Sequence, residues 1–284
     1  MTGIIINGKE MASKIQDALK TEISSLSKKP KLAVILVGDN PASVIYVGHK
    51  KKVGEKIGAD TEVFQLSPVM TEDALISFIE ELNQNKEIDG ILVQLPLPKH
   101  FNENKVLEAL SPEKDVDGLH PKNLGDLFLT DTDLKPCTPL ACMELIKSVC
   151  PKIEGKTALI IGRSRLVGKP LAQMLLKQNA TVIQAHSKTE NMKELCNMAD
   201  ILVAATGKPH LIDPSFIKKG SVVIDVGITR LDDNKIIGDL DFEEIKEIAG
   251  FITPVPGGVG PMTVTMLFVN LLIAYKKNLA KSPK

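Results

Sequence analysis

Short apolar runs alternate with amphipathic segments along most of the chain. Strand-like runs occupy residues 31–37, 61–65 and 90–94, and the segments between them, 43–57 and 71–82, have the periodicity of helices. Strands buried on both faces are nearly continuous apolar runs, whereas helices repeat their apolar residues with a period of about 3.6. Alternation of the two patterns predicts βαβ units and a parallel sheet, so we expect an α/β fold.

The same alternation begins again in the second half of the chain. A turn-rich stretch, 114–134, precedes a predicted helix over 139–149, and further strands are predicted at 157–161, 181–185, 201–204, 221–226 and 251–253. The last segment, 263–277, has a helical pattern with no strand after it. Because its apolar face must be buried, we expect this C-terminal helix to pack back on the first domain.

The length of 284 residues suits two domains of ordinary size. We predict an N-terminal α/β domain over 1–138, completed by 263–284, and a second α/β domain over 139–262. Lys plus Arg and Asp plus Glu number 35 each, and this balance argues against a nucleic acid or a membrane surface as the main partner.

The cysteines and the chain's apolar segments bear on compartment and metal content. The 4 cysteines form no C-x-x-C pair, so we predict buried reduced thiols and no metal site. The N-terminal residues have no basic leader, and the apolar stretch 266–275 is shorter than the ~20 residues of a membrane span. We therefore expect a soluble, cytoplasmic protein.

A glycine turn follows the apolar run 157–161 and opens a helical pattern: Gly162-Arg-Ser-Arg-Leu-Val-Gly168-Lys-Pro. A buried strand that ends in such a turn is how a Rossmann-type domain offers backbone N–H groups to a pyrophosphate. The spacing differs from the usual G-x-G-x-x-G, and a plain strand-to-helix turn is the alternative. The βαβ context favours the functional interpretation, so we expect a Rossmann-type dinucleotide-binding domain over 139–262.

The end of the next strand bears on the choice of dinucleotide. An NAD site usually places an acid there for the ribose 2′-hydroxyl, about 20 residues after the glycine turn. Here the chain has His186-Ser187-Lys188, and hydroxyl and basic groups hold a 2′-phosphate that a carboxylate would repel. With Arg163 in the turn, this favours NADP, whereas Glu190 close by is the feature that suits NAD.

Tyr46 and Lys50 are four residues apart in a predicted helix, so they share one face. A phenol beside an ammonium is a proton-handling pair, because each shifts the pKa of the other. The alternative is a chance spacing, with Lys50 opening the solvated run 50–52. Short-chain dehydrogenases also use Tyr-x-x-x-Lys, but after their glycine turn, and here the pair precedes it.

Three further segments carry candidate site residues. Gln94 ends a buried strand, where site residues of open α/β sheets usually lie, although it could simply cap a loop. Asp115 and Asp117 precede Gly118 in a pattern that often forms only a turn. The loop 253–263 mixes glycines with prolines, so it is stiff yet lets a ligand approach its backbone closely.

Taken together, these segments resemble the bifunctional methylenetetrahydrofolate dehydrogenase/methenyltetrahydrofolate cyclohydrolases. The matching motifs occur in the family's order over nearly the whole chain: Pro41-Ala-Ser-x-x-Tyr-x-x-x-Lys50, 89–98 (DGILVQLPLP), 114–118 (KDVDG), 136–139 (PCTP), 162–170, 225–228 (DVGI) and 254–261 (PVPGGVGP). One departure is Ala141, where the family usually has glycine.

The resemblance implies a reaction and roles in the first domain. Methylenetetrahydrofolate would be oxidised to the methenyl cation with NADP, and water would open the cation to 10-formyltetrahydrofolate, in one-carbon metabolism and purine biosynthesis. The family pattern makes Lys50 the catalytic residue of hydrolysis, oriented by Gln94. Tyr46 would stack on the folate and relay a proton, Asp117 would bind the pterin, and Ser43 would line the substrate wall.

The resemblance also implies the cofactor site. The family pattern places five residues against NADP, namely Gly162, Arg163, Ser164, Ser187 and Ile228. The loop containing Pro256 and Gly257 would border both ligands, with folate in a cleft between the domains, and the family forms homodimers. The alternatives are a monofunctional folate dehydrogenase, a non-catalytic NADP-binding sensor and a hydroxy-acid dehydrogenase, and the complete set of Tyr46, Lys50 and Asp117 speaks against the sensor.

Overall fold

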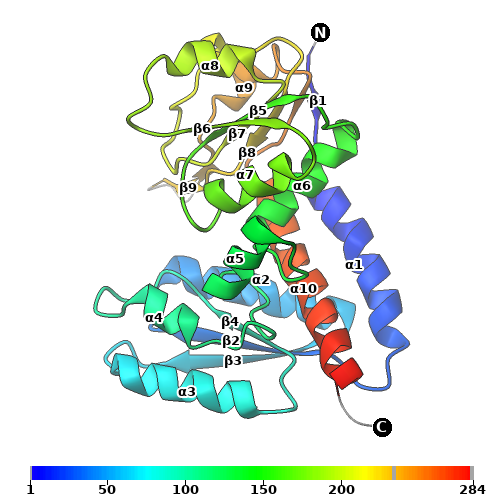
Figure 1. Cartoon of the computed structure of the whole chain (residues 1–284), viewed down its shortest axis with the longest axis vertical. Helices are drawn as coiled ribbons and strands as arrows, with labels where there is room; N and C mark the ends of the chain where they lie inside the picture. The colour runs from blue at the N-terminus through cyan, green and yellow to red at the C-terminus, as the bar shows by residue number, and fades with distance from the viewer. Residues whose placement is uncertain (1, 232–234, 282–284) are drawn as a thin grey trace. The chain divides into compact units, whose positions relative to one another are not determined.

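The structure, a computed structural model, describes residues 2–231 and 235–281 (Figure 1). The chain divides into two compact units. Unit 1 contains the residues up to Ala12 together with 138–263, and unit 2 contains 13–137 together with the residues from Val264 onwards. Each unit is an α/β domain with its own parallel sheet, as the alternation of patterns predicts.

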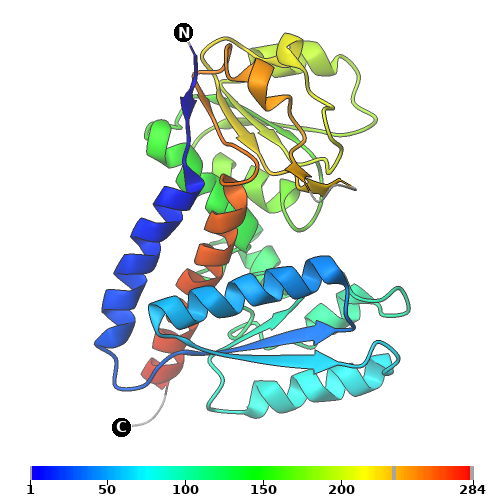
Figure 2. The same ribbon diagram turned by 180° about the vertical axis from the view of Figure 1, so that it is seen from behind.

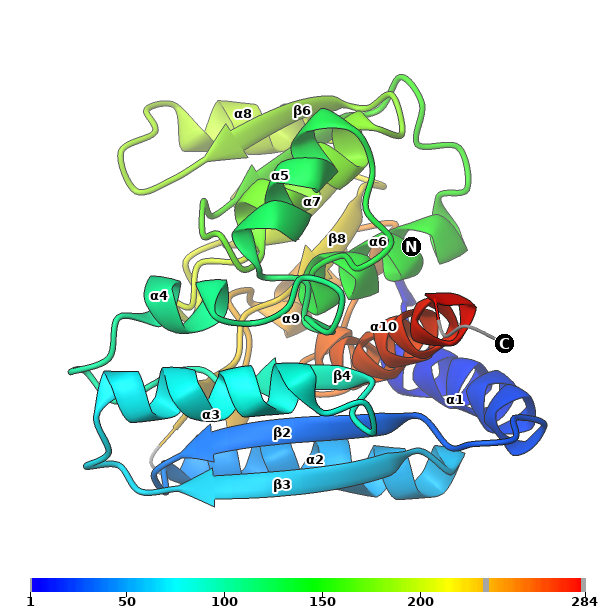
Figure 3. The ribbon, with the colours of Figure 1, turned by 60° about the horizontal axis from the view of Figure 1, so that its bottom comes forward.

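Unit 2 is built on a three-stranded parallel sheet in the order β3-β2-β4. The strands are β2 (Lys31–Val37), β3 (Asp60–Leu66) and β4 (Gly90–Val93). Helices α2 (Pro41–Ile57) and α3 (Glu72–Gln84) cover opposite faces of this sheet (Figures 2 and 3). Ala33, Ile35 and Val37 pack with the buried residues of α3, and the residues between them point to the other face, as strand alternation requires.

The stretch 114–134, which the sequence marks as turn-rich, contains the short helix α5 (Pro121–Leu129), and another short helix, α4 (Glu103–Glu108), comes just before it. His120 caps the start of α5: its imidazole Nδ1 accepts from the Lys122 N–H at 3.0 Å. Pro121 occupies the first helical position. This N-cap arrangement with proline is typical of a helix start. The helix follows directly on the segment that carries Asp115 and Asp117.

Unit 1 contains a six-stranded parallel sheet in the order β1-β11-β8-β7-β5-β6. Its strands are β1 (Ile4–Ile5), β5 (Thr157–Ile161), β6 (Thr181–Ala185), β7 (Ile201–Ala204), β8 (Val222–Asp225) and β11 (Phe251–Ile252). The chain runs from β5 outward to β6 on one side and then returns to β7 on the other. Ligands of open α/β sheets bind where the strand order reverses in this way, at the carboxyl ends of the strands.

The remaining elements of unit 1 are helical segments and one small hairpin: α6 (Cys137–Val149), α7 (Gly168–Leu176), α8 (Met192–Met198), the 3₁₀ turn η1 (Pro214–Phe216), β9 (Thr229–Arg230) paired with β10 (Ile236–Ile237), and α9 (Phe242–Ile245). On β5, Leu159 and Ile161 pack with the buried residues of α8 and α9. Ala158 and Ile160 are also fully buried and point to the opposite face.

The first residues of the chain differ from the sequence-based division, which assigned 1–138 to the N-terminal domain. Strand β1 pairs with β11 through Ile4 and Ile5, so these residues belong to the sheet of unit 1. Helix α1 (Gly8–Ser24), which the pattern analysis did not predict, then leads into unit 2. A strand of two residues that pairs with residues far along the chain leaves no local pattern.

The C-terminal helix α10 spans Val259–Lys281, longer than the predicted 263–277, and 282–284 lie outside the described residues. By length and composition alone, Val259–Ala280 would suit a membrane span, but 67% of that window is buried inside the structure. Core helices of folded domains have the same composition. From Val264 onwards the helix belongs to unit 2, where Phe268, Asn270 and Tyr275 are almost fully buried.

The cysteines are all free thiols. Cys137, Cys142 and Cys196 are buried, whereas Cys150 is half-buried. Burial raises the pKa of Cys142 and of Cys196 to about 12, so both remain protonated and unreactive near neutral pH. Ala141, the position at which the family usually has glycine, is fully buried in α6.

Candidate active site

Helix α2 carries Ser43, Tyr46 and Lys50. Its start is fixed by Asn40, whose side-chain oxygen accepts from the N–H groups of Ala42 and Ser43 at 3.0 and 3.2 Å. Gly58, in the left-handed conformation with φ 85°, ends it. An asparagine N-cap and a left-handed glycine are the usual boundary signals, so the sequence fixes the length of this helix locally.

The buried residues of α2 form one stripe: Ser43, Val47, Lys50, Gly54 and Ile57. Lys50 therefore points inward with only 9% of its surface exposed, while its neighbours Lys51 and Lys52 are exposed. The solvated-run interpretation of Lys50 is wrong. Tyr46 is half-buried and lies one turn before Lys50 on the same side of the helix.

The Lys50 amine is held by the residue that follows β4. Its Nζ donates to Oε1 of Gln94 at 2.8 Å, and Nε2 of Gln94 donates to the carbonyl of Leu95 at 2.6 Å. The second hydrogen bond fixes the orientation of the amide, so its oxygen faces the lysine. Gln94 thus bonds a loop carbonyl, as the loop interpretation expects, and at the same time accepts from the amine of Lys50.

Burial lowers the pKa of Lys50, because the surroundings disfavour the charged ammonium. The carboxylate of Asp117 and the Cys137 thiol oppose this shift of the pKa. The structure thereby brings three of the predicted residues, Lys50, Gln94 and Asp117, into one electrostatic group. A buried lysine with a lowered pKa is the form of this side chain that accepts protons near neutral pH.

The segment around Asp117 is fixed by its neighbours. Lys114 donates to the carbonyls of Leu82, Asn83 and Asn85, at 3.2, 2.8 and 2.7 Å, and so caps the carboxyl end of α3. Sequence reasoning missed this role, because nothing near Lys114 in the chain signals a helix end. Lys114 therefore has a structural role. Asp117 is half-buried, and its negative charge acts on the amine of Lys50.

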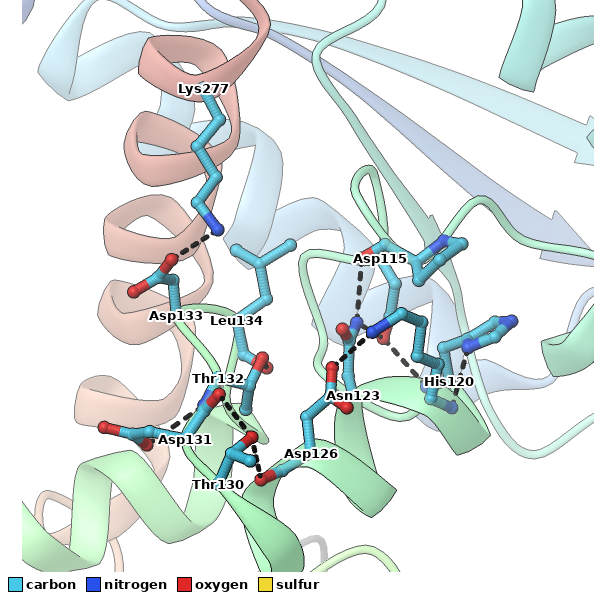
Figure 4. A network of polar contacts seen from close by, with 12 residues as sticks. Asp115, His120, Asn123, Asp126, Thr130, Asp131, Thr132, Asp133, Leu134 and Lys277 are labelled. Carbon is cyan, nitrogen blue, oxygen red and sulfur yellow. Dashed lines mark hydrogen bonds and ion pairs between the residues drawn. The ribbon is translucent and has the colours of Figure 1, made fainter.

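Asp115 is a structural acid as well. It is fully buried, and its carboxylate accepts from the backbone N–H of His120 at 2.8 Å and from Nδ2 of Asn123 at 2.9 Å (Figure 4). Burial raises the pKa of Asp115 to about 6. The two acids of the motif thus differ in role: Asp115 shapes the turn into α5, and Asp117 remains available to a ligand.

In unit 1, the turn after β5 has no room for a side chain at either of its two glycines. Gly162 has φ 137°, and a Cβ there would lie 2.3 Å from the carbonyl oxygen of Ala205. A Cβ on Gly168 would lie 2.1 Å from the carbonyl oxygen of Gly162, so the two ends of the turn touch. The turn sits at the carboxyl end of β5, beside the point where the strand order reverses. These are the features of a pyrophosphate-binding turn.

The predicted cofactor residues of this turn have different environments. Ser164 accepts at its hydroxyl oxygen from the N–H of Val167 at 3.1 Å and, more weakly, from that of Gly168 at 3.5 Å, so it caps the start of α7. Arg163 is exposed at the mouth of the turn. Arginine at that place suits an anionic ligand, and the serine shapes the loop.

A tight turn follows β6. The N–H of His186 donates to the Thr189 hydroxyl at 2.9 Å, and the N–H of Thr189 donates back to the His186 carbonyl at 2.8 Å. Nδ1 of His186 accepts from the N–H of Lys188 at 3.2 Å, so this histidine has a local structural role. The turn leaves Ser187 and Lys188 exposed at its tip. The hydroxyl of Ser187 and the ammonium of Lys188 are therefore accessible at the strand end where a Rossmann-type domain binds the ribose of its dinucleotide.

Ile228 and the loop after β11 complete the predicted set. Ile228 follows β8 and is 44% exposed, so its side chain is accessible to a ligand. In the loop, Gly257 has φ 108° and its carbonyl accepts from the Lys9 N–H at 2.9 Å. Pro256 beside it is exposed and follows a cis peptide bond.

Sequence reasoning missed a pair of buried aspartates in unit 1. Asp225 accepts from the N–H groups of Gly227 and Asp239 at 3.0 Å each and from that of Leu240 at 3.1 Å. Asp239 accepts from the N–H groups of Thr206 and Gly207, at 2.6 and 3.2 Å. Together they tie the loops after β7 and β8 to one segment. Only the DVGI motif at Asp225 hinted at this cluster.

Each aspartate also packs against a glycine that neighbours the other aspartate in the chain. A Cβ on Gly227 would lie 2.2 Å from Oδ1 of Asp239, and a Cβ on Gly238 would lie 2.0 Å from Oδ2 of Asp225. Burial raises the pKa of Asp225 to about 7, and the nearby Asp239 adds to the shift. Among the described residues, no group of three or more His, Cys, Asp or Glu side chains could hold a metal ion.

The fold and the two sites define a two-domain α/β enzyme that binds a nicotinamide dinucleotide. Residues 6–117 match the family model of the tetrahydrofolate dehydrogenase/cyclohydrolase catalytic domain, and 136–279 match that of its NAD(P)-binding domain. The chain therefore belongs to the tetrahydrofolate dehydrogenase/cyclohydrolase family, and the resemblance noted in the sequence is confirmed.

Curated relatives and solved structures agree with this assignment. The bifunctional protein FolD of Listeria innocua is 52% identical over 97% of this chain and 98% of its own. The crystal structure of the bifunctional FolD enzyme of Campylobacter jejuni has a TM-score of 0.93 and 44% identity, covering 96% of this chain and 98% of its own. The FolD of Trypanosoma brucei, solved with NADP and an inhibitor, has a TM-score of 0.95 and 35% identity, covering 99% and 100%.

Proposed function

We propose that this protein oxidises 5,10-methylenetetrahydrofolate to the methenyl cation with NADP⁺ and then hydrolyses that cation to 10-formyltetrahydrofolate. The observation that carries the proposal is the buried Lys50 amine held by Gln94 in unit 2, in a chain whose unit 1 has a dinucleotide turn. A dehydrogenase alone has no use for a buried lysine with a lowered pKa, because hydride transfer leaves a stabilised iminium ion without proton transfer.

The residues of unit 1 fit NADP⁺, which when bound accepts the hydride. Gly162 and Gly168 permit a tight turn in which a Cβ at either would collide with backbone atoms, and such a turn between a strand and a helix is suited to binding a pyrophosphate. Arg163, Ser187 and Lys188 are exposed and supply cationic and hydroxyl donors for a 2′-phosphate. The remaining task of the protein in this step is to align two rings, and alignment alone can contribute several kcal/mol (~7–11) to catalysis.

Hydrolysis requires a base, and Lys50 is the base that the structure supports. As water adds to the methenyl carbon, it loses a proton, which the neutral amine of Lys50 accepts. The resulting ammonium returns a proton to the ring nitrogen when its bond to that carbon breaks. Gln94 holds one N–H of the amine throughout. A cationic substrate beside Lys50 would lower its pKa further.

Tyr46, Ser43 and Asp117 form the folate-binding part of the proposal. Tyr46 lies one turn from Lys50 and offers an aromatic face for stacking, and Ser43 lies on the same helix. The half-buried carboxylate of Asp117 suits the parallel N–H donors of an amino-pyrimidine edge, much as it would suit a guanidinium. In this scheme Pro256 and Gly257 contribute an exposed, stiff loop that borders the ligands.

Three properties of the whole protein complete the proposal: a homodimer, cytoplasmic location and small-molecule ligands rather than nucleic acid or membrane. The family resemblance supports the homodimer, the free thiols suit the cytoplasm, and the balanced charge of 35 basic and 35 acidic residues supports small-molecule ligands. Light scattering of the purified protein tests the dimer, and cell fractionation tests the location. The route from its product to purine biosynthesis is also part of this proposal.

The reaction is tested by supplying methylenetetrahydrofolate with NADP⁺, and separately with NAD⁺, while NADPH and the methenyl product are recorded independently. NADPH that forms faster than the methenyl product accumulates is the expected result, since water consumes the cation. Equal amounts of the two would leave a monofunctional dehydrogenase. No turnover with either cofactor would refute the enzyme and favour a cofactor sensor.

A further inference from the structure

Asn270 of helix α10 is fully buried and bonds to two separate backbone segments of unit 2. Its Nδ2 donates to the carbonyl of Val116 at 2.8 Å and to the carbonyl of Lys135 at 2.8 Å. Val116 directly precedes Asp117, and Lys135 lies in the segment that passes over Gly118. One amide group thus holds Val116, which precedes Asp117, and Lys135, which packs on Gly118 just after it.

Close packing surrounds the segment that carries Asp117, and the two hydrogen bonds of Asn270 add to it. A Cβ on Gly90 of β4 would lie 2.4 Å from the Val116 side chain, so that side chain fills the space over the glycine. On the other side, Gly118 has φ 71°, and a Cβ there would lie 2.3 Å from the carbonyl carbon of Lys135. The backbone of 116–118 therefore has contacts before and after Asp117, and Asn270 links them.

Packing alone does not explain an asparagine at this position. Oδ1 of Asn270 is buried and has no hydrogen-bond partner among the described residues. A buried acceptor without a partner is costly, whereas leucine of similar size would fill the space without that cost. The asparagine is therefore retained for its two donors.

The thiol of Cys137 belongs to the same arrangement. Its Sγ donates to the carbonyl of Val116 at 3.3 Å, and Nδ2 of Asn270 lies 3.6 Å from Sγ. The pKa of Cys137 is well above its usual value, first because the thiol is buried and then because Asp117 lies beside it. Asn270, Cys137 and Asp117 are thus consecutive members of one network that ends at the carboxylate.

We propose that Asn270 is a positioning residue for folate recognition: it holds the backbone before Asp117 and the Lys135 segment that packs on Gly118 after it, so that this carboxylate meets the pterin in a defined orientation. The inference rests on the proposed function, in which Asp117 binds the folate. Asn270 touches no reacting group, and it acts through Asp117 alone. The predicted signature is therefore a weaker Michaelis complex with folate, while the chemistry at Lys50 and the affinity for NADP are retained.

The test compares N270L with T265V in the dehydrogenase assay. Thr265 is the matched control, because it is also fully buried on α10 and accepts from Nε2 of Gln16 at 2.8 Å. We expect N270L to raise KM for methylenetetrahydrofolate about tenfold, equivalent to about 1.4 kcal/mol, with kcat and KM for NADP⁺ changed less than about twofold. T265V should lower the thermal midpoint about as much as N270L does, and it should leave kcat and the KM values for the folate and for NADP⁺ unchanged.

A double-mutant cycle shows whether the effect passes through Asp117. D117A should raise the folate KM strongly, and N270L added to it should raise KM no further, because the group that Asn270 positions is gone. If the effect of N270L persists in full in the D117A background, Asn270 acts structurally and the inference is overturned. N270S, which is smaller and keeps one donor, replaces N270L if the leucine variant does not fold, and it should give a smaller rise.

Failure of the inference and failure of the proposed function are distinguishable. A D117A variant with a raised folate KM, beside an N270L variant with an unchanged one, overturns only the role of Asn270. A D117A variant with an unchanged folate KM overturns the assignment of Asp117, and with it the role of Asn270. The bifunctional activity itself is decided separately, by the two products of the wild-type protein.

Discussion

The buried carboxylate of Asp225 makes the stability of unit 1 depend on pH in an unusual direction. Its pKa is raised to about 7, from about 3.9 in an unfolded chain, so the folded state binds the proton more tightly. Between these two values the folded protein carries more protons than the unfolded one. Stability contributed by this group is therefore full at low pH and is lost as pH rises toward 7.

The size of the effect follows from the two pKa values. For a group that titrates at about 3.9 unfolded and about 7 folded, linkage gives a loss of about 2–3 kcal/mol between pH 5 and pH 8. The D225N variant has no such titration. It keeps an oxygen for the N–H groups of Gly227 and Asp239 but turns an amide toward the N–H of Leu240, at a constant cost of about 1–3 kcal/mol.

The assay is urea unfolding of wild type and D225N from pH 5 to pH 8 at constant ionic strength. We expect the variant to have the lower free energy of unfolding at pH 5. Between pH 5 and pH 8, the wild type should lose about 2–3 kcal/mol of that free energy that the variant does not lose. D200N is the control in the same unit. The pKa of Asp200 is lowered, first by its hydrogen bond with Lys218, so its titration lies below this window. Parallel curves for wild type and D225N would refute the reasoning.

The remaining predictions concern activity and the dinucleotide turn. K50M should lose about 10²–10⁴-fold in hydrolysis of the methenyl cation and keep the dehydrogenase, and in wild type that hydrolysis should rise with pH as the amine of Lys50 deprotonates. An R163A/S187A variant should lose its preference for NADP⁺ over NAD⁺ in kcat/KM, and an unchanged preference would refute the 2′-phosphate assignment. G162A should weaken dinucleotide binding and cost more than ~1 kcal/mol in unfolding, because of its φ of 137°, whereas G125A, with nothing within 4 Å of its Cβ, should be neutral or stabilising.

Local patterns predicted the elements whose signals are local. The run 31–37 forms β2 and the run 157–161 forms β5, because a short continuous apolar run flanked by turn residues indicates a buried strand. The start of α2 and the turn at Gly162 likewise depend on neighbouring residues only. The glycine turn is recognisable in the sequence alone, because strand, turn and helix follow one another directly along the chain.

Features made by distant residues left no such signal. Asn270 contacts Val116 across 154 positions, and β1 pairs with β11 across most of the chain. Asp239 has no motif of its own, and its role exists only because Thr206 and Gly207 lie beside it in the fold. Each of these residues looks like an ordinary polar or apolar residue in the sequence, since its partners are supplied by the topology.

Lys50 shows how the structure decides between two interpretations that the sequence leaves open. A lysine in the run 50–52 is ordinarily solvated, and its spacing from Tyr46 could arise by chance. The structure places it instead on the buried stripe of α2, where desolvation lowers the pKa and no carboxylate of the described residues forms an ion pair with the amine. A fold gains nothing in stability from such a residue, because burying an ammonium is costly unless it is fully paired. Its neutral partner Gln94 holds the amine without restoring its charge, and this combination serves a base better than it serves a core.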